Sequence, residues 1–143
     1  MFLQNSFGKN VDLLHRSMDV AMLRRDVIAN NLANADTPNF KRTVVNFESS
    51  LKRALDSERE SAEAMPAIMT DPRHIPFTRP IDYRTVMPRR VLDYLTATDN
   101  NGNNVDLEEE NMLALHNQLN YNLMVQSVSY EFSQINSALR LGG

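Results

Sequence analysis

The chain has 143 residues, a formal net charge of −3 at neutral pH and no cysteine. Its hydrophobic content of 42% and charged content of 23% are typical of a foldable domain and argue against a disordered tail. The acidic balance argues against nucleic acid as a partner, the lack of cysteine excludes disulfides and thiolate chemistry, and no apolar run is long enough to span a membrane.

The first segment, residues 1–45, is predicted to form a long helix that ends in a turn. Its N-terminal sequence has no basic stretch followed by an unbroken apolar one, so we expect no cleaved secretory signal. Apolar residues then recur at alternating spacings of three and four, interrupted once by Arg25, which is the pattern of a coiled-coil seam. The seam residues that we place at a helix interface are Val11, Leu14, Met18, Ala21 and Ile28.

Asparagine is unusually frequent where this helix should end. Residues 28–42 read IANNLANADTPNFKR and contain four asparagines. Asparagine is a poor helix-interior residue because its side chain competes for backbone hydrogen bonds. The helix should stop near Ala35, before the turn at Asp36, Thr37 and Pro38. The asparagines therefore indicate a role for this stretch besides helix stability.

The middle segment, residues 46–104, differs in composition from both ends. It contains five of the six prolines, which exclude a long helix there and disfavour central strands. We expect extended, flexible and poorly ordered chain, with a polar stretch at Glu48–Glu63 that is partly helical. Residues 83–92 are a candidate short strand, and residues 91–95 are an alternative helical turn.

The last segment, residues 105–143, is predicted to be one long helix. Asp106 suits the N-cap, and Glu109 three residues later completes a capping-box pattern. The adjoining run of three glutamates lies in the first turn, where the helix dipole favours negative charge.

Two apolar stripes on this helix point in nearly opposite directions at about 100° per residue. One stripe contains Met112, Leu115, Leu119 and Leu123, and the other contains Tyr121, Val125, Val128, Phe132, Ile135 and Leu139. Two opposed stripes indicate different neighbours, which a multi-subunit assembly would supply. The alternative is a monomer whose middle segment covers the second stripe.

The two terminal segments carry complementary charge. Residues 1–45 contain six basic and four acidic residues, whereas residues 101–143 contain one arginine and five acidic residues. We therefore predict a mainly α fold in which the terminal helices pair as a coiled-coil-like domain.

No residue pattern indicates catalysis, a cofactor or a metal site. His15 and His116 lie on the predicted helices without a second ligand at suitable spacing. Asp71 and His74 are close enough in sequence to form an acid–base pair. However, Asp-Pro sequences are common in turns, and no nucleophile motif accompanies this pair. We therefore predict no enzyme activity. The alternative enzyme hypothesis requires the middle segment to fold around Asp71 and His74.

The stretch at residues 28–42 resembles the N-terminal signature of the axial proteins of the bacterial flagellum, the rod and hook family. The residues that match are Asn30, Asn31, Leu32, Ala33, Asn34, Thr37, Pro38, Phe40 and Lys41. Asn39 stands where many members have glycine, and asparagine tolerates the left-handed turn nearly as well. The short length, the TDPRHI segment at residues 70–75 and the GNNVDLE helix start at residues 102–108 are most similar to proximal rod members.

The resemblance implies a structural subunit of the flagellar basal-body rod that self-assembles helically and transmits torque. Its implied partners are copies of itself, other rod proteins, and the proteins of the basal-body base and export gate, with no nucleic acid and no small-molecule substrate. It implies export by the flagellar type III system without a cleaved signal. We also expect the side chains of Asn31 and Asn34 to hydrogen-bond across subunits. The alternatives are another rod subunit, or a soluble coiled-coil adaptor or export chaperone.

Overall fold

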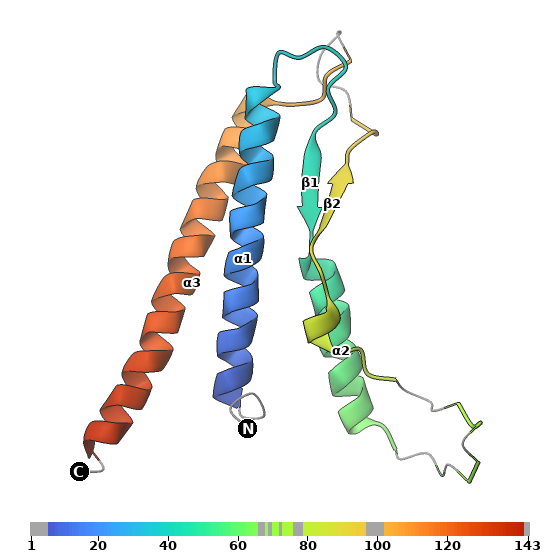
Figure 1. Ribbon diagram of the computed structural model, residues 1–143, viewed down its shortest axis with the longest axis vertical. Coiled ribbons are helices and arrows are strands. Elements are labelled where there is room, and N and C mark those ends of the chain that lie inside the picture. Colours follow the sequence, from blue (N-terminus) through green and yellow to red (C-terminus); the bar gives the residue numbers. More distant parts are fainter. Residues whose placement is uncertain are drawn as a thin grey trace. The chain divides into compact units, whose positions relative to one another are not determined.

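The computed structural model describes residues 6–65, 68, 70, 71, 73–75, 79–96 and 102–141. This part of the chain is mainly helical, with three α-helices and a sheet of two short strands (Figure 1). None of the described helices is both long and apolar enough to cross a membrane. The chain divides into two compact units, one formed by Met1–Val45 with Val91–Gly143 and the other by Asn46–Arg90.

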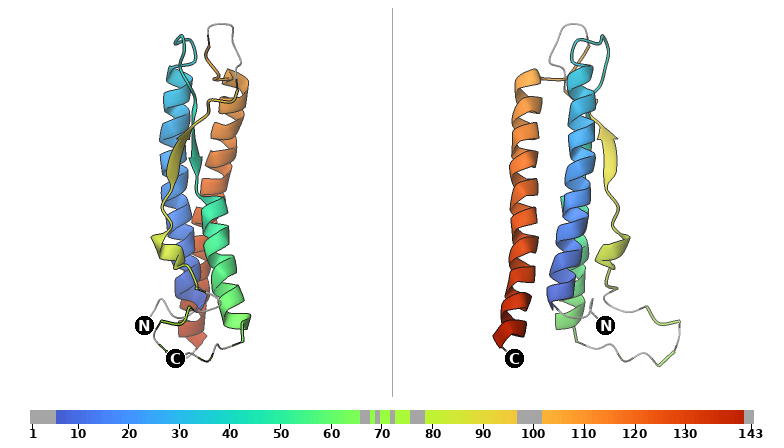
Figure 2. Two further views of the ribbon diagram at one scale, coloured as in Figure 1. Left: turned by 90° about the vertical axis from the view of Figure 1, so that its right-hand side faces the viewer. Right: turned by 60° about the vertical axis from the view of Figure 1, so that its left-hand side comes forward.

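Helices α1 (Ser6–Ala33) and α3 (Leu107–Leu141) form the frame of the first unit. They run side by side in opposite directions in all three ribbon views (Figures 1 and 2). The core between them and the adjoining strand contains Val20, Ala21, Val27 and Ile28 from α1. The expected mainly α fold is therefore present, with its two long helices at the two ends of the sequence.

Helix α1 ends two residues before the predicted position. Its last turn tightens, since the amides of Asn34 and Ala35 donate to the carbonyls of Asn31 and Leu32. The chain then turns through Asn39, whose φ of 60° lies in the left-handed region. The expectation that asparagine fills a position suited to glycine is confirmed.

Helix α3 begins as the capping pattern predicts. The Asp106 carboxylate accepts the amides of Glu108 and Glu109 at 2.8 and 3.2 Å, which satisfies two donors of the first turn. The Glu109 carboxylate extends to Arg42 at 2.7 Å. The predicted cap is confirmed, and the side chain expected to complete the capping box is used for a contact with the chain after α1.

Strands β1 (Thr43–Asn46) and β2 (Arg89–Leu92) form the two-stranded sheet. They run antiparallel (Figure 1), and next to them the amide of Asp93 donates to the carbonyl of Arg42 at 3.0 Å. The strand expected at residues 83–92 is present only over Arg89–Leu92, because Tyr83–Thr85 form a 3-10 turn. The alternative helical turn at residues 91–95 is wrong.

The second unit contains α2 (Glu48–Glu63), which is followed by a 3-10 turn at Tyr83–Thr85. The hydroxyl of Ser57 on α2 accepts the amide of Ile81 at 3.0 Å, just before this turn. The helix expected in part of the polar stretch is present and covers all sixteen of its residues, which contain no proline. Pro66, Pro72 and Pro76 lie outside the described residues.

Candidate assembly surface

Asn31 connects the end of α1 to the first strand. Its amide nitrogen donates to the carbonyl of Thr43 at 2.9 Å, and its amide oxygen accepts the amide of Thr43 at 3.0 Å. The same nitrogen lies 3.2 Å from Oε1 of Glu110 on α3. Asn31 is 1% exposed, and both of its amide protons are used within the chain. The expectation that Asn31 hydrogen-bonds across subunits is therefore wrong.

Asn103 closes the turn after α1 from the other side. Its buried amide nitrogen lies 2.7–3.0 Å from the carbonyls of Asn34, Ala35 and Thr37, which follow the last helical turn. Its oxygen accepts the amide of Val105 at 2.7 Å. Asn103 therefore bonds to carbonyls of the turn that follows α1 and holds this turn against the chain that enters α3.

Asn104 performs a similar task one residue later. Its oxygen accepts the amide of Arg42 at 2.6 Å, and its nitrogen donates to the carbonyl of Asp93 and to the hydroxyl of Thr96 at 2.7 and 3.0 Å. Nearby, the ammonium group of Lys41 donates to the carbonyl of Gly102 at 2.8 Å. Three separate stretches of chain are thus joined by side chains that replace backbone partners. We call this region, residues 30–43 with 102–110, the signature junction.

A charged cluster lies at one end of the signature junction. The Arg42 guanidinium forms ion pairs with Glu109 at 2.7 Å and with Glu110 at 3.6 Å. Burial raises the pKa of Glu110 above its ordinary value, against the hydrogen bond from Asn31 and the charge of Arg42, which lower it. Burial lowers the pKa of Arg42, but the hydrogen bond and charge of Glu109 outweigh this effect and the net pKa is raised. The ion pairs of Arg42 with Glu109 and Glu110 thus join the basic first segment to the acidic last segment.

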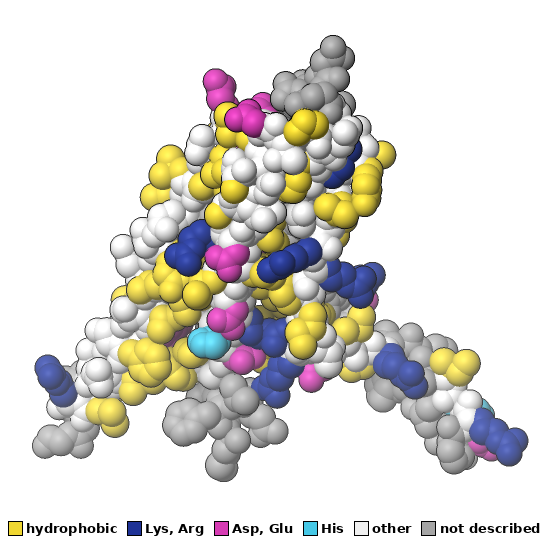
Figure 3. Space-filling view, turned by 45° about the horizontal axis from the view of Figure 1, so that its top comes forward, with side chains coloured by type: hydrophobic (Ala, Val, Ile, Leu, Met, Phe, Trp, Pro, Cys, Tyr) yellow, Lys and Arg dark blue, Asp and Glu magenta, His cyan; other side chains and the backbone are white. Residues whose placement is uncertain are grey.

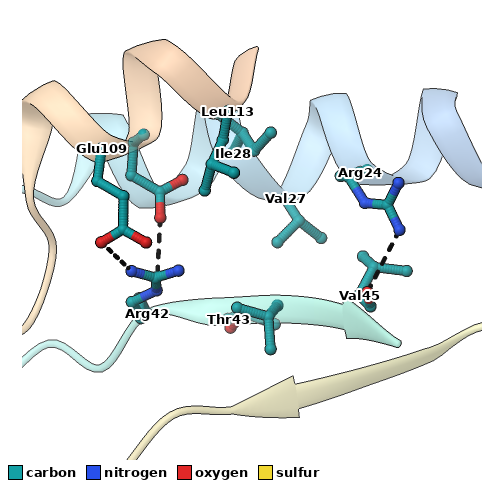
Figure 4. A pocket seen from close by; sticks show the side chains of 10 residues that line it. Arg24, Val27, Ile28, Arg42, Thr43, Val45, Glu109 and Leu113 are labelled. Carbon is teal, nitrogen blue, oxygen red and sulfur yellow. Dashed lines mark hydrogen bonds and ion pairs between the residues drawn. The ribbon is translucent and has the colours of Figure 1, made fainter. Parts of the chain in front are cut away.

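An apolar groove of about 230 Å³ adjoins this cluster (Figure 4). Its walls come from α1, β1 and α3, and its lining includes Val27, Ile28, Val45 and Leu113. At the end away from Arg42, Arg24 donates to the carbonyl of Val45 at 3.5 Å.

The face of α3 toward α1 follows a regular heptad pattern. The partly or fully buried positions that define it are 110, 114, 117, 121, 124, 128, 131 and 135, spaced alternately by four and three. Cross-helix contacts fall on or beside this face, since Asn117 donates to the carbonyl of Ala21 at 2.8 Å and the Phe132 ring meets the Phe7 ring edge to face. We call this face the α1-facing seam. Both Glu110 and Asn117 on it are buried.

The opposite face of α3 carries an exposed apolar stripe. Met112, Leu115, Leu119 and Leu123 are 53–65% exposed, and hydrophobic side chains reach the surface over α3 on the left of the space-filling view (Figure 3). No Asp, Glu, Lys or Arg occurs between Asn111 and Tyr130. We call these four residues the outer stripe. The outer stripe is therefore an exposed apolar surface. A partner could bury it without desolvating an acidic or basic side chain.

The predicted interface residues therefore have three different environments. Ala21 and Ile28 are buried, and Val11, Leu14, Met18, Tyr121, Val128 and Ile135 are partly buried. Val125, Phe132, Leu139 and the outer stripe are exposed. Of the signature residues, Asn31 is buried, Leu32, Asn34 and Phe40 are partly buried, and Asn30, Ala33, Thr37 and Pro38 are exposed.

Four residues that matter most at this surface were not predicted. In sequence, Asn103 and Asn104 are typical turn residues and Glu110 is typical of a first helical turn, and Asn117 belongs to no predicted motif. One sequence signal for the last two exists, because Glu110 and Asn117 are seven residues apart and continue into the apolar series at Tyr121 and Val128.

The Asp71 and His74 pair has the geometry of a turn. The Asp71 carboxylate accepts the amide of Arg73 at 2.8 Å, and its carbonyl accepts the amide of His74 at 3.0 Å. Both side chains are exposed. The carboxylate is thus used to shape the loop. Within the described residues no His, Asp and Glu side chains gather as a metal site.

Comparison with known proteins identifies the family. Residues 21–41, which cover the signature stretch, match the family described as flagella basal body rod protein. The FlgB basal body rod protein of Borreliella burgdorferi is 40% identical over 136 residues, which are 95% of this chain and 99% of that protein. The chain belongs to the flagellar basal body rod protein family.

The match to less similar members of this rod family also covers most of both chains. FlgB of Bacillus subtilis is 32% identical over 95% of this chain and 97% of its own length. FlgB of Escherichia coli is 26% identical over 88% of this chain and 89% of its own length. The rod-family resemblance therefore spans both terminal helices and the middle segment, well beyond the signature junction.

Proposed function

We propose that the chain is a FlgB-like structural subunit of the basal-body rod, which assembles helically with copies of itself and other axial proteins and transmits torque. The outer stripe carries this proposal. A helix that packs on one neighbour needs only one apolar face, whereas α3 has an α1-facing seam and a second apolar face that no described residue covers.

The pairing of α1 with α3 supports a coiled-coil-like inner domain in each subunit. The α1-facing seam keeps the four–three spacing from residue 110 to residue 135, which is the repeat that lets two long helices stay in contact. In this proposal residues 1–45 and 105–143 form the inner domain, and residues 46–104 are the segment between them, whose last residues, Asn103 and Asn104, bond to the inner domain.

The exposed part of the signature stretch supports a second contact surface. Asn30, Thr37 and Pro38 are exposed at the end of α1, whereas Asn31 holds the turn in shape from inside. We propose that the signature junction presents a rigid end to the next subunit. The outer stripe and the signature junction are different surfaces of the subunit. Contacts between the stripe of one subunit and the junction of the next are heterologous, and such contacts build open-ended assemblies.

This assignment places the subunit in the rod, after export through the flagellar type III apparatus without a cleaved signal. Its neighbours are then rod proteins and the base of the basal body. The test is a strain that lacks the gene, examined by electron microscopy of basal bodies and by the secretion of later axial proteins. Rods of normal length and undiminished secretion would contradict the proposal.

A soluble adaptor or export chaperone is the competing assignment. The exposed Met22 and Met112 favour it, because methionine side chains adapt to varied clients. It requires a discrete small oligomer that stays in the cytoplasm, and cell fractionation separates the two assignments. The other alternative is a FlgC-like rod subunit. It is tested by expressing a FlgC protein in the deletion strain and asking whether rods form again.

A further inference from the structure

The α1-facing seam contains polar side chains where packing alone would select apolar ones. Glu110 and Asn117 are 1% and 6% exposed and lie one heptad apart. Single buried polar residues in coiled coils fix the register of the helices, because only one alignment satisfies them. The partners of these two residues on α1 show whether they have such a role.

Asn117 contacts the backbone of α1 at its small seam residue. Its nitrogen donates to the carbonyl of Ala21 at 2.8 Å, an approach that a side chain larger than methyl would block. The seam residues one turn to either side of Ala21 are Met18 and Arg25. A slip of one turn would place the amide of Asn117 against a long side chain and leave it buried without a partner.

Glu110 provides a second polar contact with a fixed partner. Its Oε1 accepts from Asn31 at 3.2 Å and lies 3.6 Å from Nε of Arg42. A slipped helix would leave this carboxylate buried away from the amide and the guanidinium. One alignment of α1 and α3 therefore gives partners to the amide nitrogen of Asn117 and to Oε1 of Glu110, whereas the amide oxygen of Asn117 and Oε2 of Glu110 are buried without a partner.

We propose that Asn117, paired with Ala21, is the specificity-determining residue that fixes the register of α1 against α3. It acts as a positioning residue, since it touches only the other helix. In this register the outer stripe faces away from α1. Its use by neighbouring subunits rests on the proposed function, whereas the register itself does not.

The lack of cysteine allows a disulfide reporter of register in the dilute full-length chain. Met22 and Gln118 line one small cavity with Asn117, so Met22→Cys is combined in turn with Leu115→Cys, Gln118→Cys and Asn122→Cys. These three partners sample the native alignment and shifts of one turn in either direction. With Asn117 present, we expect the pair at 22 and 118 to cross-link about tenfold more than either other pair.

In the Asn117→Leu background we expect the three yields to come within about twofold of one another, since an apolar seam accepts several registers. The exchange Ala21→Asn with Asn117→Ala restores an asparagine opposite an alanine and should restore the preference. Asn111→Leu, at an exposed position on α3, is the matched control and should leave the preference unchanged. Circular dichroism of each variant confirms that the helices form.

An unchanged preference in Asn117→Leu, or no recovery in the exchange variant, would overturn the register proposal. Neither result bears on the rod assignment. Conversely, a deletion strain with normal rods would remove the rod assignment and leave the cross-linking preference intact.

Discussion

The amide group of Asn31 pairs with both backbone groups of Thr43, accepting its N–H at 3.0 Å and donating to its C=O at 2.9 Å. A side-chain amide has the same donor and acceptor as a peptide group, so Asn31 acts on β1 as an adjacent strand would. In this chain, the asparagine at the end of α1 is therefore the hydrogen-bond partner of the strand that follows the turn.

Replacement of Asn31 by leucine should destabilise the isolated subunit. The change leaves both backbone groups of Thr43 and one oxygen of Glu110 without their partner, and each buried unsatisfied group costs about 1–3 kcal/mol. We expect the free energy of unfolding to fall by at least about 2 kcal/mol in urea titrations. Asn30→Leu, at an exposed position beside it, should change it by less than about 0.5 kcal/mol. Equal effects of the two changes would refute this role of Asn31.

Gly102 and Asn39 approach each other closely across the signature junction. A Cβ at Gly102 would lie 2.7 Å from Oδ1 of Asn39, and the φ of Gly102 is +80°. Gly102→Ala should therefore cost about 1–3 kcal/mol of stability. Asn39→Gly should be tolerated, because φ at this position is 60°. In a double-mutant cycle, Asn39→Gly should recover the steric part of the Gly102→Ala loss, and strict additivity would disprove the contact.

Stability should depend on pH through Glu110. Burial raises the pKa of this carboxyl in the folded chain above its value in the unfolded chain. Its stabilising contribution is then complete below the unfolded pKa and is lost as the pH rises through the folded pKa. Glu110→Gln keeps a neutral side chain at every pH, so the stability of this variant relative to the parent should increase from about pH 4 to about pH 7.

Urea unfolding of both chains at the two pH values measures this difference. Glu108→Gln, which removes an exposed carboxylate from the same helical turn, controls for the loss of one charge. A relative stability of Glu110→Gln that is flat or falls with pH would show that the raised pKa does not influence folding.

The helix boundaries could be predicted because local chemistry determines them. Asp106 caps α3 as its sequence indicates, and Asn39 adopts the left-handed conformation expected where many family members have glycine. Both effects act over a few neighbouring residues. The helix at Glu48–Glu63 is longer than the partly helical stretch that the sequence predicts, because nothing in its sixteen residues interrupts it.

The long-range polar contacts could not be predicted in the same way. Asn103 bonds to carbonyls 66–69 residues earlier in the chain, and nothing near it in sequence indicates a partner. The assignment of Asn31 to an intersubunit contact failed for the same reason, since its partners Thr43 and Glu110 meet it only after α1 and α3 have paired. The outer stripe could be predicted, because a helical period is a local property of the sequence.

The most direct test of the assembly account replaces Leu115 and Leu119 of the outer stripe by lysine and asks whether rods form. Both side chains are more than half exposed, and lysine is a good helix former, so unfolding of the purified subunit should change by less than about 0.5 kcal/mol. A matched control, Asn111→Lys with Gln118→Lys, adds the same charge at exposed positions beside the stripe. In a strain that lacks the native gene, we expect the control to restore basal-body rods and the stripe variant to yield none. Normal rods from the stripe variant would contradict the account.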